Sequence, residues 1–227
     1  MNTFLKRGFR PLISTIIVVG LLVFTLIPPS AQAMPVFINE FHYDNVGSDV
    51  GEGVELVGAA GIDLQGWQLW FYNGSNGQAY KSLTLSGVLS DQHQGYGTLA
   101  FSVAGLQNGS PDGIALADAN QQLQQFISYE GAFMALSGIA AGVLSEDVGV
   151  AEGGGTAVGM SLQLRGQTIE QLQWQAGINS FGTVNEGQQF SSLNTQEAVA
   201  VSTAPSWMLV AGGAFGLLLT WPRRVNR

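Results

Sequence analysis

Short apolar runs separated by glycine-rich breaks fill the middle of the chain, and they predict β-strands. Nine runs are each about one strand long and are bounded by Gly, Asn, Asp or Ser: PVFINEF, GVELVG, WQLWFYN, KSLTLSG, GTLAFSV, GIALAD, LQQFISY, SLQLRG and LQWQAG. Runs of this length with turn residues between them are typical of an all-β sandwich or barrel. The segment 131–155 is less regular, and we expect a long loop there with at most one short helical turn.

Turn residues give part of the strand pairing. Asn-Gly pairs at 73–74 and 76–77 follow an aromatic run, and both residue types tolerate the positive φ that hairpin turns require. We therefore expect the strand at 68–72 to turn back into 79–85. The stretch NGSPDG at 108–113 has the same turn chemistry and leads into the next apolar run.

The first 33 residues have the layout of a secretory signal peptide. Three basic residues lie within the first ten positions, an apolar run extends from Leu12 to Ile27, and the residues SAQA place alanine at the −3 and −1 positions of a cleavage site. We expect cleavage after Ala33 and an exported mature chain that begins at Met34. The alternative is an uncleaved membrane anchor, because the apolar run is near the lower length for a span.

A second apolar stretch closes the sequence. It runs from Ala204 to Trp221, about one bilayer core long at ~1.5 Å of rise per residue, and arginines follow at 223, 224 and 227. We expect a membrane span with the arginines on the cytoplasmic side and the rest of the chain outside, at the cell surface. The layout resembles PEP-CTERM sorting signals, which exosortase-like enzymes process in Gram-negative bacteria. Residues 202–205 read STAP where those signals usually carry Pro-Glu-Pro, so processing and a plain uncut transmembrane helix both remain open.

These features divide the chain into four predicted parts. They are a signal peptide at 1–33, a β domain at 34–192, a linker at 193–203, and a C-terminal transmembrane or sorting segment with a basic tail at 204–227. The external part is long enough to bury about two thirds of its unfolded surface, which favours one self-sufficient domain. The sequence contains no cysteine, so packing rather than disulfides must stabilise this domain.

The external part is strongly acidic. Lys81 and Arg165 are its only basic residues between Met34 and Val201, whereas all 16 acidic residues lie there, which gives a net charge of −14. Nucleic-acid binding draws most of its affinity from Lys and Arg contacts with phosphates. The charge therefore disfavours direct nucleic-acid binding, and its simplest role is to keep an exported protein soluble.

Five motifs follow one another along the external chain: INEFHYDN, GEGVELVG, DLQGWQLWFYNG, LQNGSPDGIALAD and FISYEG. Together they resemble the lamin-tail domain superfamily, above all its bacterial branch, which is often attached to secreted nucleases and other extracellular proteins. The resemblance covers Val36 to Phe190 and implies an immunoglobulin-like β-sandwich. It also implies an accessory role in adhesion or positioning rather than hydrolysis. The predicted fold is thus an all-β, lamin-tail type sandwich flanked by an N-terminal signal helix and a C-terminal hydrophobic helix.

The most specific motif residues have structural explanations. Trp67 and Leu69 alternate with Gln68, so we expect both to face the core between two sheets. Asp63 is expected to accept backbone N–H groups in the turn before this strand. None of these roles requires a ligand.

An acidic stretch at 44–52 is a candidate cation site. Asp44, Asp49 and Glu52 could supply hard oxygen ligands to calcium on a glycine-containing loop. The alternating ligands and distant glutamate of an EF-hand are absent, and an acidic exposed loop is the alternative. Glu40 and Glu55 lie within predicted strands, where we expect them on the solvent face or as turn caps.

The inventory of catalytic side chains is poor. The sequence has two histidines and no cysteine, and GMSLQ at 159–163 lacks the final glycine of a nucleophile elbow. Paired glycosidase carboxylates remain open, because their spacing is spatial. We predict a non-catalytic exported surface module, without a cofactor other than calcium, that binds an extracellular protein or polysaccharide. The alternative is a secreted hydrolase or an accessory domain of an extracellular nuclease system.

Overall fold

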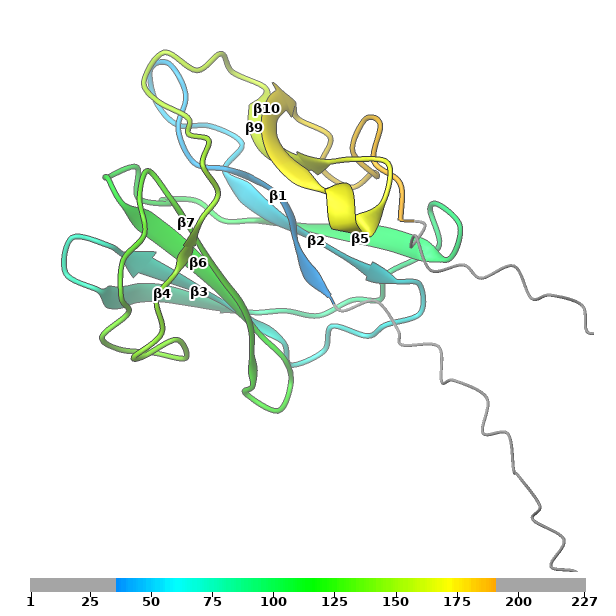
Figure 1. Ribbon diagram of the computed structural model, residues 1–227, viewed down its shortest axis with the longest axis horizontal. Coiled ribbons are helices and arrows are strands. Elements are labelled where there is room, and N and C mark those ends of the chain that lie inside the picture. The colour runs from blue at the N-terminus through cyan, green and yellow to red at the C-terminus, as the bar shows by residue number, and fades with distance from the viewer. Residues whose placement is uncertain (1–35, 191–227) are drawn as a thin grey trace, which may run out of the picture. The chain divides into compact units, whose positions relative to one another are not determined.

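A computed structural model describes residues 36–190, which form two β-sheets (Figure 1). Sheet A has the order β10-β9-β1-β2-β5, and sheet B has the order β4-β3-β6-β7-β8. The elements are β1 (Phe37–His42), β2 (Gly53–Ala59), β3 (Gln68–Asn73), β4 (Gln78–Thr84), β5 (Tyr96–Ser102), β6 (Asp112–Ala117), β7 (Leu123–Tyr129), β8 (Glu146–Asp147), β9 (Met160–Arg165), the 3₁₀ turn η1 (Ile169–Gln171) and β10 (Gln173–Ile178). The expected all-β fold with two sheets is confirmed.

Each apolar run from the sequence coincides with or overlaps a strand of the structure. β3 and β4 form the predicted antiparallel hairpin, with Gln68 opposite Thr84 and Asn73 opposite Gln78. The segment 131–155 is mainly loop without a helical turn, as expected, and it also supplies β8, which pairs in parallel with β7. β8 could not be predicted from the sequence, because a strand of two residues in a Gly- and Ala-rich stretch has no alternating apolar pattern.

The core lies between the sheets, and Leu69 and Trp67 both pack on it as expected, although to different depths. Leu69 and Phe71 of β3 are fully buried there, but Trp67 is only partly buried and packs against the side of the core. Trp67 precedes β3 in a turn, where its N–H donates to the carbonyl of Leu64 at 3.0 Å. The buried Leu64 side chain occupies the core at this end of the strand, so the larger indole remains at the margin.

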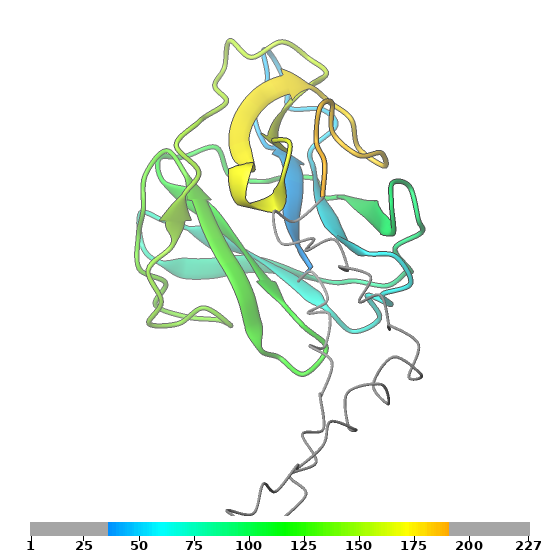
Figure 2. The same ribbon diagram turned by 45° about the vertical axis from the view of Figure 1, so that its right-hand side comes forward.

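A bulge in β1 sorts the side chains of sheet A onto two faces. Ile38 pairs with Leu56, and both contribute to the core between the sheets, which we call the inner face. The register shifts between Ile38 and Glu40, so Glu40 pairs with Glu55 on the opposite, outer face. Segment 179–190, orange in Figure 2, lies against this outer face through hydrogen bonds described below. The outer face is therefore covered.

Several predicted segments lie outside the described residues. They are the signal peptide at 1–33, the linker at 193–203, the C-terminal segment at 204–227 and the helices expected in both end segments. Between residues 36 and 190, none of the helical structure has the length and apolar character needed to cross a membrane.

Candidate functional site

A buried histidine–carboxylate pair joins the end of β1 to the segment before β9. His42 is 2% exposed, and its Nδ1 lies 2.8 Å from Oε1 of Glu152. The other carboxylate oxygen of Glu152 accepts hydrogen bonds from the backbone N–H groups of Tyr43 and Asp44, at 2.7 and 3.2 Å. One carboxylate therefore fixes both the ring and the backbone at this end of the sheet.

The partners of the His42 ring determine its charge. Nε2 faces Oδ1 of Asn45 at 3.1 Å and the carbonyl of Val50 at 3.2 Å, and both groups are acceptors. The Asn45 amide is fixed in this orientation because its Oδ1 accepts the Val50 N–H and its Nδ2 donates to two backbone carbonyls. The hydrogen bond to Glu152 raises the pKa of His42 above 6.5, against the effect of burial. Both ring nitrogens are engaged within the fold, so neither is free to act as a general base.

Glu40 is the centre of a polar cluster on the outer face of sheet A. It is fully buried, and it accepts hydrogen bonds from Ser161 Oγ and Gln163 Nε2 on β9 at 2.7 and 3.1 Å. It also accepts from the backbone N–H and the hydroxyl of Ser180 at 2.8 and 2.7 Å. The carboxylate thus ties segment 179–190 to the sheet.

Glu55 makes the second tie. It is fully buried, and it accepts hydrogen bonds from Asn39 Nδ2 at 2.9 Å and from the backbone N–H of Gly182 at 2.6 Å. Burial raises the pKa of Glu55 to about 7; the two hydrogen bonds oppose this shift, and the neighbouring Glu40 charge adds to it.

Glu40 and Glu55 do not face solvent, because both are fully buried, but both accept backbone N–H groups of the turn at 180–183, which agrees with the turn-capping alternative. A glutamate that alternates with apolar residues in a strand normally marks the solvent face of a two-layer sheet. Here segment 179–190 covers that face and supplies one or more donors to each carboxylate. The polar residues in NEGQQ and at 179–180 were the sequence signal that this segment covers a polar face. Asn185 donates a hydrogen bond to the Asn39 carbonyl, and Gln188 donates one to the Asn39 side chain.

Glu52, one of the three predicted calcium ligands, is used within the fold. Its two carboxylate oxygens accept hydrogen bonds from the backbone N–H groups of Gly105 and Leu106, both at 2.7 Å. Both oxygens are thereby engaged in holding the loop after β5.

Asp44 and Asp49, the other two predicted ligands, lie in the loop after β1. The Asp44 side chain is 9% exposed, and Asp49 accepts hydrogen bonds from the Asn45 N–H at 3.2 Å and from Asn108 Nδ2 at 3.4 Å. Across residues 36–190 the structure brings no three His, Cys, Asp or Glu side chains together in a group that could hold a metal ion. Calcium binding at this loop therefore gains no support from the geometry.

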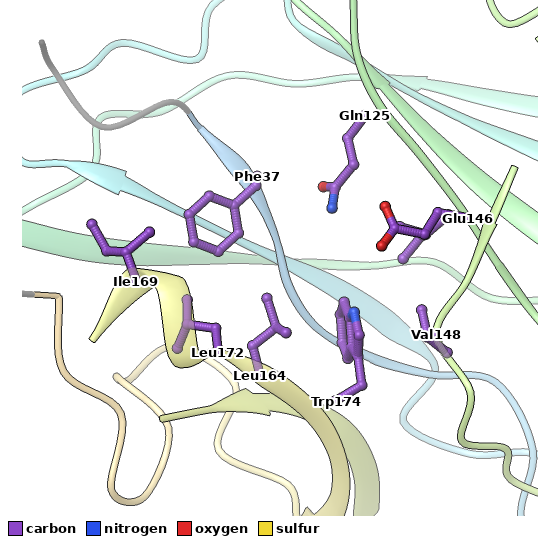
Figure 3. Close-up of a pocket in the computed structure, with 9 residues that line it drawn as sticks. Phe37, Gln125, Glu146, Val148, Leu164, Ile169, Leu172 and Trp174 are labelled. Atoms are coloured by element: carbon purple, nitrogen blue, oxygen red, sulfur yellow. The ribbon is translucent and has the colours of Figure 1, made fainter. Parts of the chain in front are cut away.

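An apolar groove opens where the two sheets diverge, between β9–β10 of sheet A and β7–β8 of sheet B (Figure 3). It has a volume of about 280 Å³. Its walls are Phe37, Leu164, Ile169, Leu172 and Trp174 on the side of sheet A, and Gln125, Ile127, Glu146 and Val148 on the side of sheet B. This groove was not predicted, because its walls come from five separate stretches of the chain; the indole in LQWQ was its only local signal.

The groove combines ring surfaces with two polar groups. Trp174 is held by an edge contact with Phe41, at 5.1 Å between ring centroids. Gln125 Oε1 accepts the N–H of Ile38 at 2.8 Å, which fixes the amide, and Glu146 is exposed on β8. Figure 3 shows the Gln125 amide and the Glu146 carboxylate close together across from the apolar wall. The arrangement suits a ligand with an apolar face and a hydrogen-bond donor or positive charge beside it.

A second depression of about 590 Å³ lies at the other end of β10. His42 lines it together with exposed Val50, Val158 and Ile178. Because both His42 ring nitrogens are bonded inside the fold, this depression presents an apolar surface rather than a basic group.

Comparison of the chain with protein-family models, with curated proteins and with solved structures gives no match. The proposals below therefore depend on the geometry of the described residues and on the sequence motifs.

Proposed function

We propose that this chain is a non-catalytic, exported cell-surface module of the lamin-tail type, with an immunoglobulin-like sandwich held at the envelope by its C-terminal segment. The sandwich binds an extracellular protein or polysaccharide through the groove between the sheets. The signal-peptide layout, the apolar C-terminal stretch and the order of the five motifs support export, anchoring and fold type.

One contrast carries the binding role. Four buried side chains could in principle act in catalysis: His42, Glu40, Glu55 and Glu152. Each of them is hydrogen-bonded to other groups within the domain. The groove residues Trp174 and Glu146, in contrast, face an accessible space. At about 280 Å³ the groove is slightly below the roughly 300–1,000 Å³ of pockets that enclose a whole small molecule. It therefore fits one sugar ring or one side chain of a larger partner.

The test compares host cells that carry the full chain, a deletion, or single variants. We expect the deletion to lower attachment of cells to one another or to their extracellular polymer. Glu146→Lys should lower attachment nearly as much, because it reverses the charge at the polar end of the groove. Trp174→Ala should also lower attachment, with a loss of stability because the ring packs on Phe41.

Asp147→Lys is the matched control, since it makes the same charge change at the neighbouring exposed position of β8, which does not line the groove. Attachment should stay at the wild-type level in this variant. If the deletion leaves attachment unchanged, the surface-binding role is wrong. If Glu146→Lys and Asp147→Lys behave alike, the groove is not the binding site.

A further inference from the structure

The two sheets have four edge strands, and β5 is protected by a side chain. Unpaired N–H and C=O groups on an edge invite another strand, and natural proteins cover or interrupt them. The Gln92 amide bonds the backbone of Thr98, accepting from its N–H at 3.2 Å and donating to its carbonyl at 3.4 Å. The Gln92 N–H donates to the Tyr96 carbonyl at 2.8 Å. Gln92 thus takes the place of a neighbouring strand along the first half of β5, at Tyr96 and Thr98.

The two edges of sheet B are protected as well. On β4, the Ala79 N–H donates to Ser137 Oγ at 2.9 Å, the adjacent Gly77 carbonyl accepts from Leu136, and Lys81 places a charge on the strand. β8 is only two residues long. Neither edge offers a continuous row of backbone groups.

β10 differs from these three edges. It pairs with β9 alone, over its full length, and Gln173, Gln175, Ala176 and Ile178 are exposed. The Asn179 N–H donates to the Gly159 carbonyl at 2.8 Å and continues this ladder. Because antiparallel residues alternate in the direction of their hydrogen bonds, positions 173, 175 and 177 bond to β9. The backbone groups of Trp174 and Ala176 then point away from the sheet.

One backbone group is bonded at each end of this edge, and its centre is open. The Leu172 N–H donates to the Ile169 carbonyl at 3.4 Å, and the Ile178 carbonyl accepts from the Gln163 amide. No hydrogen bond to the outward groups of Trp174 and Ala176 is found within residues 36–190. The open edge therefore has four backbone groups, two donors and two acceptors.

Side-chain chemistry favours a second copy of this chain as the partner. Residues 172–179 carry no charge, although the external part as a whole has a net charge of −14. Two such acidic domains can approach at this strand with less like-charge repulsion than at a charged strand. Ile178, 77% exposed, lies on the same side of β10 as Trp174 and gives the strand an apolar flank.

We propose that β10 pairs antiparallel with β10 of a second copy, about a two-fold axis at Gln175. In this register Trp174 lies opposite Ala176 of the partner subunit, and the four outward backbone groups of each strand form four hydrogen bonds. The large indole meets a small alanine, and Leu172 lies near the partner's Ile178. The two A sheets become one continuous ten-stranded sheet.

This interface is small, so the dimer is best detected by covalent cross-linking rather than by a measurement of molecular size alone. Stable interfaces bury roughly 1,200–2,000 Å², more than one added strand provides, so the pairing depends on concentration at the envelope. The chain has no cysteine, which allows single cysteines to report on the register. At Gln175 the two Cα atoms would form a non-hydrogen-bonded pair about 4.5 Å apart, within the range of a disulfide.

The experiment places Gln175→Cys and, as the matched control, Gln173→Cys in the full chain on host cells. Both positions are exposed glutamines on the same face of β10, but in the paired strands the two copies of position 173 would be four residues apart, about 13 Å. Under mild oxidation we expect Gln175→Cys to form a disulfide-linked dimer at least ten times faster than Gln173→Cys. Equal rates, no dimer from either variant, or faster linkage at 173 would overturn the pairing.

A second substitution tests the hydrogen bonds themselves. Ala176→Pro, added to Gln175→Cys, removes an N–H that points outward and leaves the ladder to β9 intact. Linkage should fall at least tenfold while the circular dichroism of the purified chain stays that of a β protein. Undiminished linkage in a folded double variant would show that the strands do not pair in this way.

Discussion

The two faces of sheet A are both buried, but different forces bury them. The inner face carries Ile38, Phe41 and Leu56, which pack against sheet B in the main core. The outer face carries Glu40 and Glu55, which are equally inaccessible but are covered by segment 179–190 through hydrogen bonds. Apolar burial is non-directional and tolerates small shifts, whereas a buried carboxylate is stable only while its donors stay in place.

The comparison indicates what each face does for the molecule. Loss of inner-face packing should weaken both sheets together, because the core is shared. Loss of an outer-face carboxylate should first release segment 179–190, since that segment supplies donors to Glu40 and Glu55.

Phe41→Ala should have the largest effect. Its ring is fully buried and contacts Tyr43, Tyr129 and Trp174, with centroid separations of 5.1–6.0 Å. Truncation of a buried phenylalanine costs about 3–5 kcal/mol, enough to threaten a domain of ordinary stability. Urea unfolding of the purified chain would measure the loss. A cost below about 1 kcal/mol would contradict the assignment of Phe41 to a close-packed core.

Much of this inner face could be predicted from sequence, and the outer face could not. Apolar runs such as GVELVG located the strands because their period depends only on local spacing. The same period assigned Glu55 to solvent, because it cannot show that a segment about 130 residues later covers that face. The groove was missed for the same reason, since Phe37 and Trp174 meet only in the folded chain. Trp67 packs on the core as its alternation with Gln68 predicted, but it is only partly buried, and it lies before the strand begins.

The pH dependence of stability should identify Glu55. Its pKa is about 7 in the folded chain against 4.5 without burial, so its contribution is fully present below pH 4.5 and is lost as the pH rises through 7. One unit of pKa corresponds to about 1.4 kcal/mol, so the loss over this shift is about 3–4 kcal/mol. Thermal unfolding between pH 4.5 and 8 would measure it, and Glu55→Gln should flatten the curve.

Other titratable groups set the control for this measurement. The Glu40 charge also raises the pKa of Glu55, and Arg165 of β9 pairs with the exposed Glu186 at 3.6 Å. His42 acts in the same direction, because its raised pKa gives stability that is present below 6.5 and lost at higher pH. Glu55→Gln should therefore leave a residual slope near neutral pH that His42→Gln removes. An unchanged slope in Glu55→Gln would show that Glu55 is not protonated near neutral pH.

Glu40→Gln should open the outer face locally. The amide keeps the size of the side chain but places an NH₂ group among donors from Ser161, Gln163 and Ser180. An unsatisfied buried group costs about 1–3 kcal/mol. Hydrogen exchange should accelerate at the Ser180 and Gly182 amides more than at strand amides of the inner core. Ser161→Ala, which removes one donor, is the milder control, and uniform acceleration along the chain would contradict the division between the faces.

The smallest effect is expected for the acidic residues of the loop after β1, whose carboxylates lie at the edge of sheet A rather than inside it. Asp49 has two hydrogen bonds, at 3.2 and 3.4 Å, and lies in an exposed loop, so Asp49→Asn should cost about 0.5–1 kcal/mol. The Glu52 oxygens already accept the Gly105 and Leu106 N–H groups, and residues 36–190 bring no three acidic or histidine side chains together around a metal position. Millimolar calcium should therefore leave the melting temperature as it is in chelator at matched ionic strength. A rise that Asp44→Asn with Asp49→Asn abolishes would show that the loop rearranges to bind the ion, and that its acids belong to a ligand site rather than to the hydrogen-bonded frame.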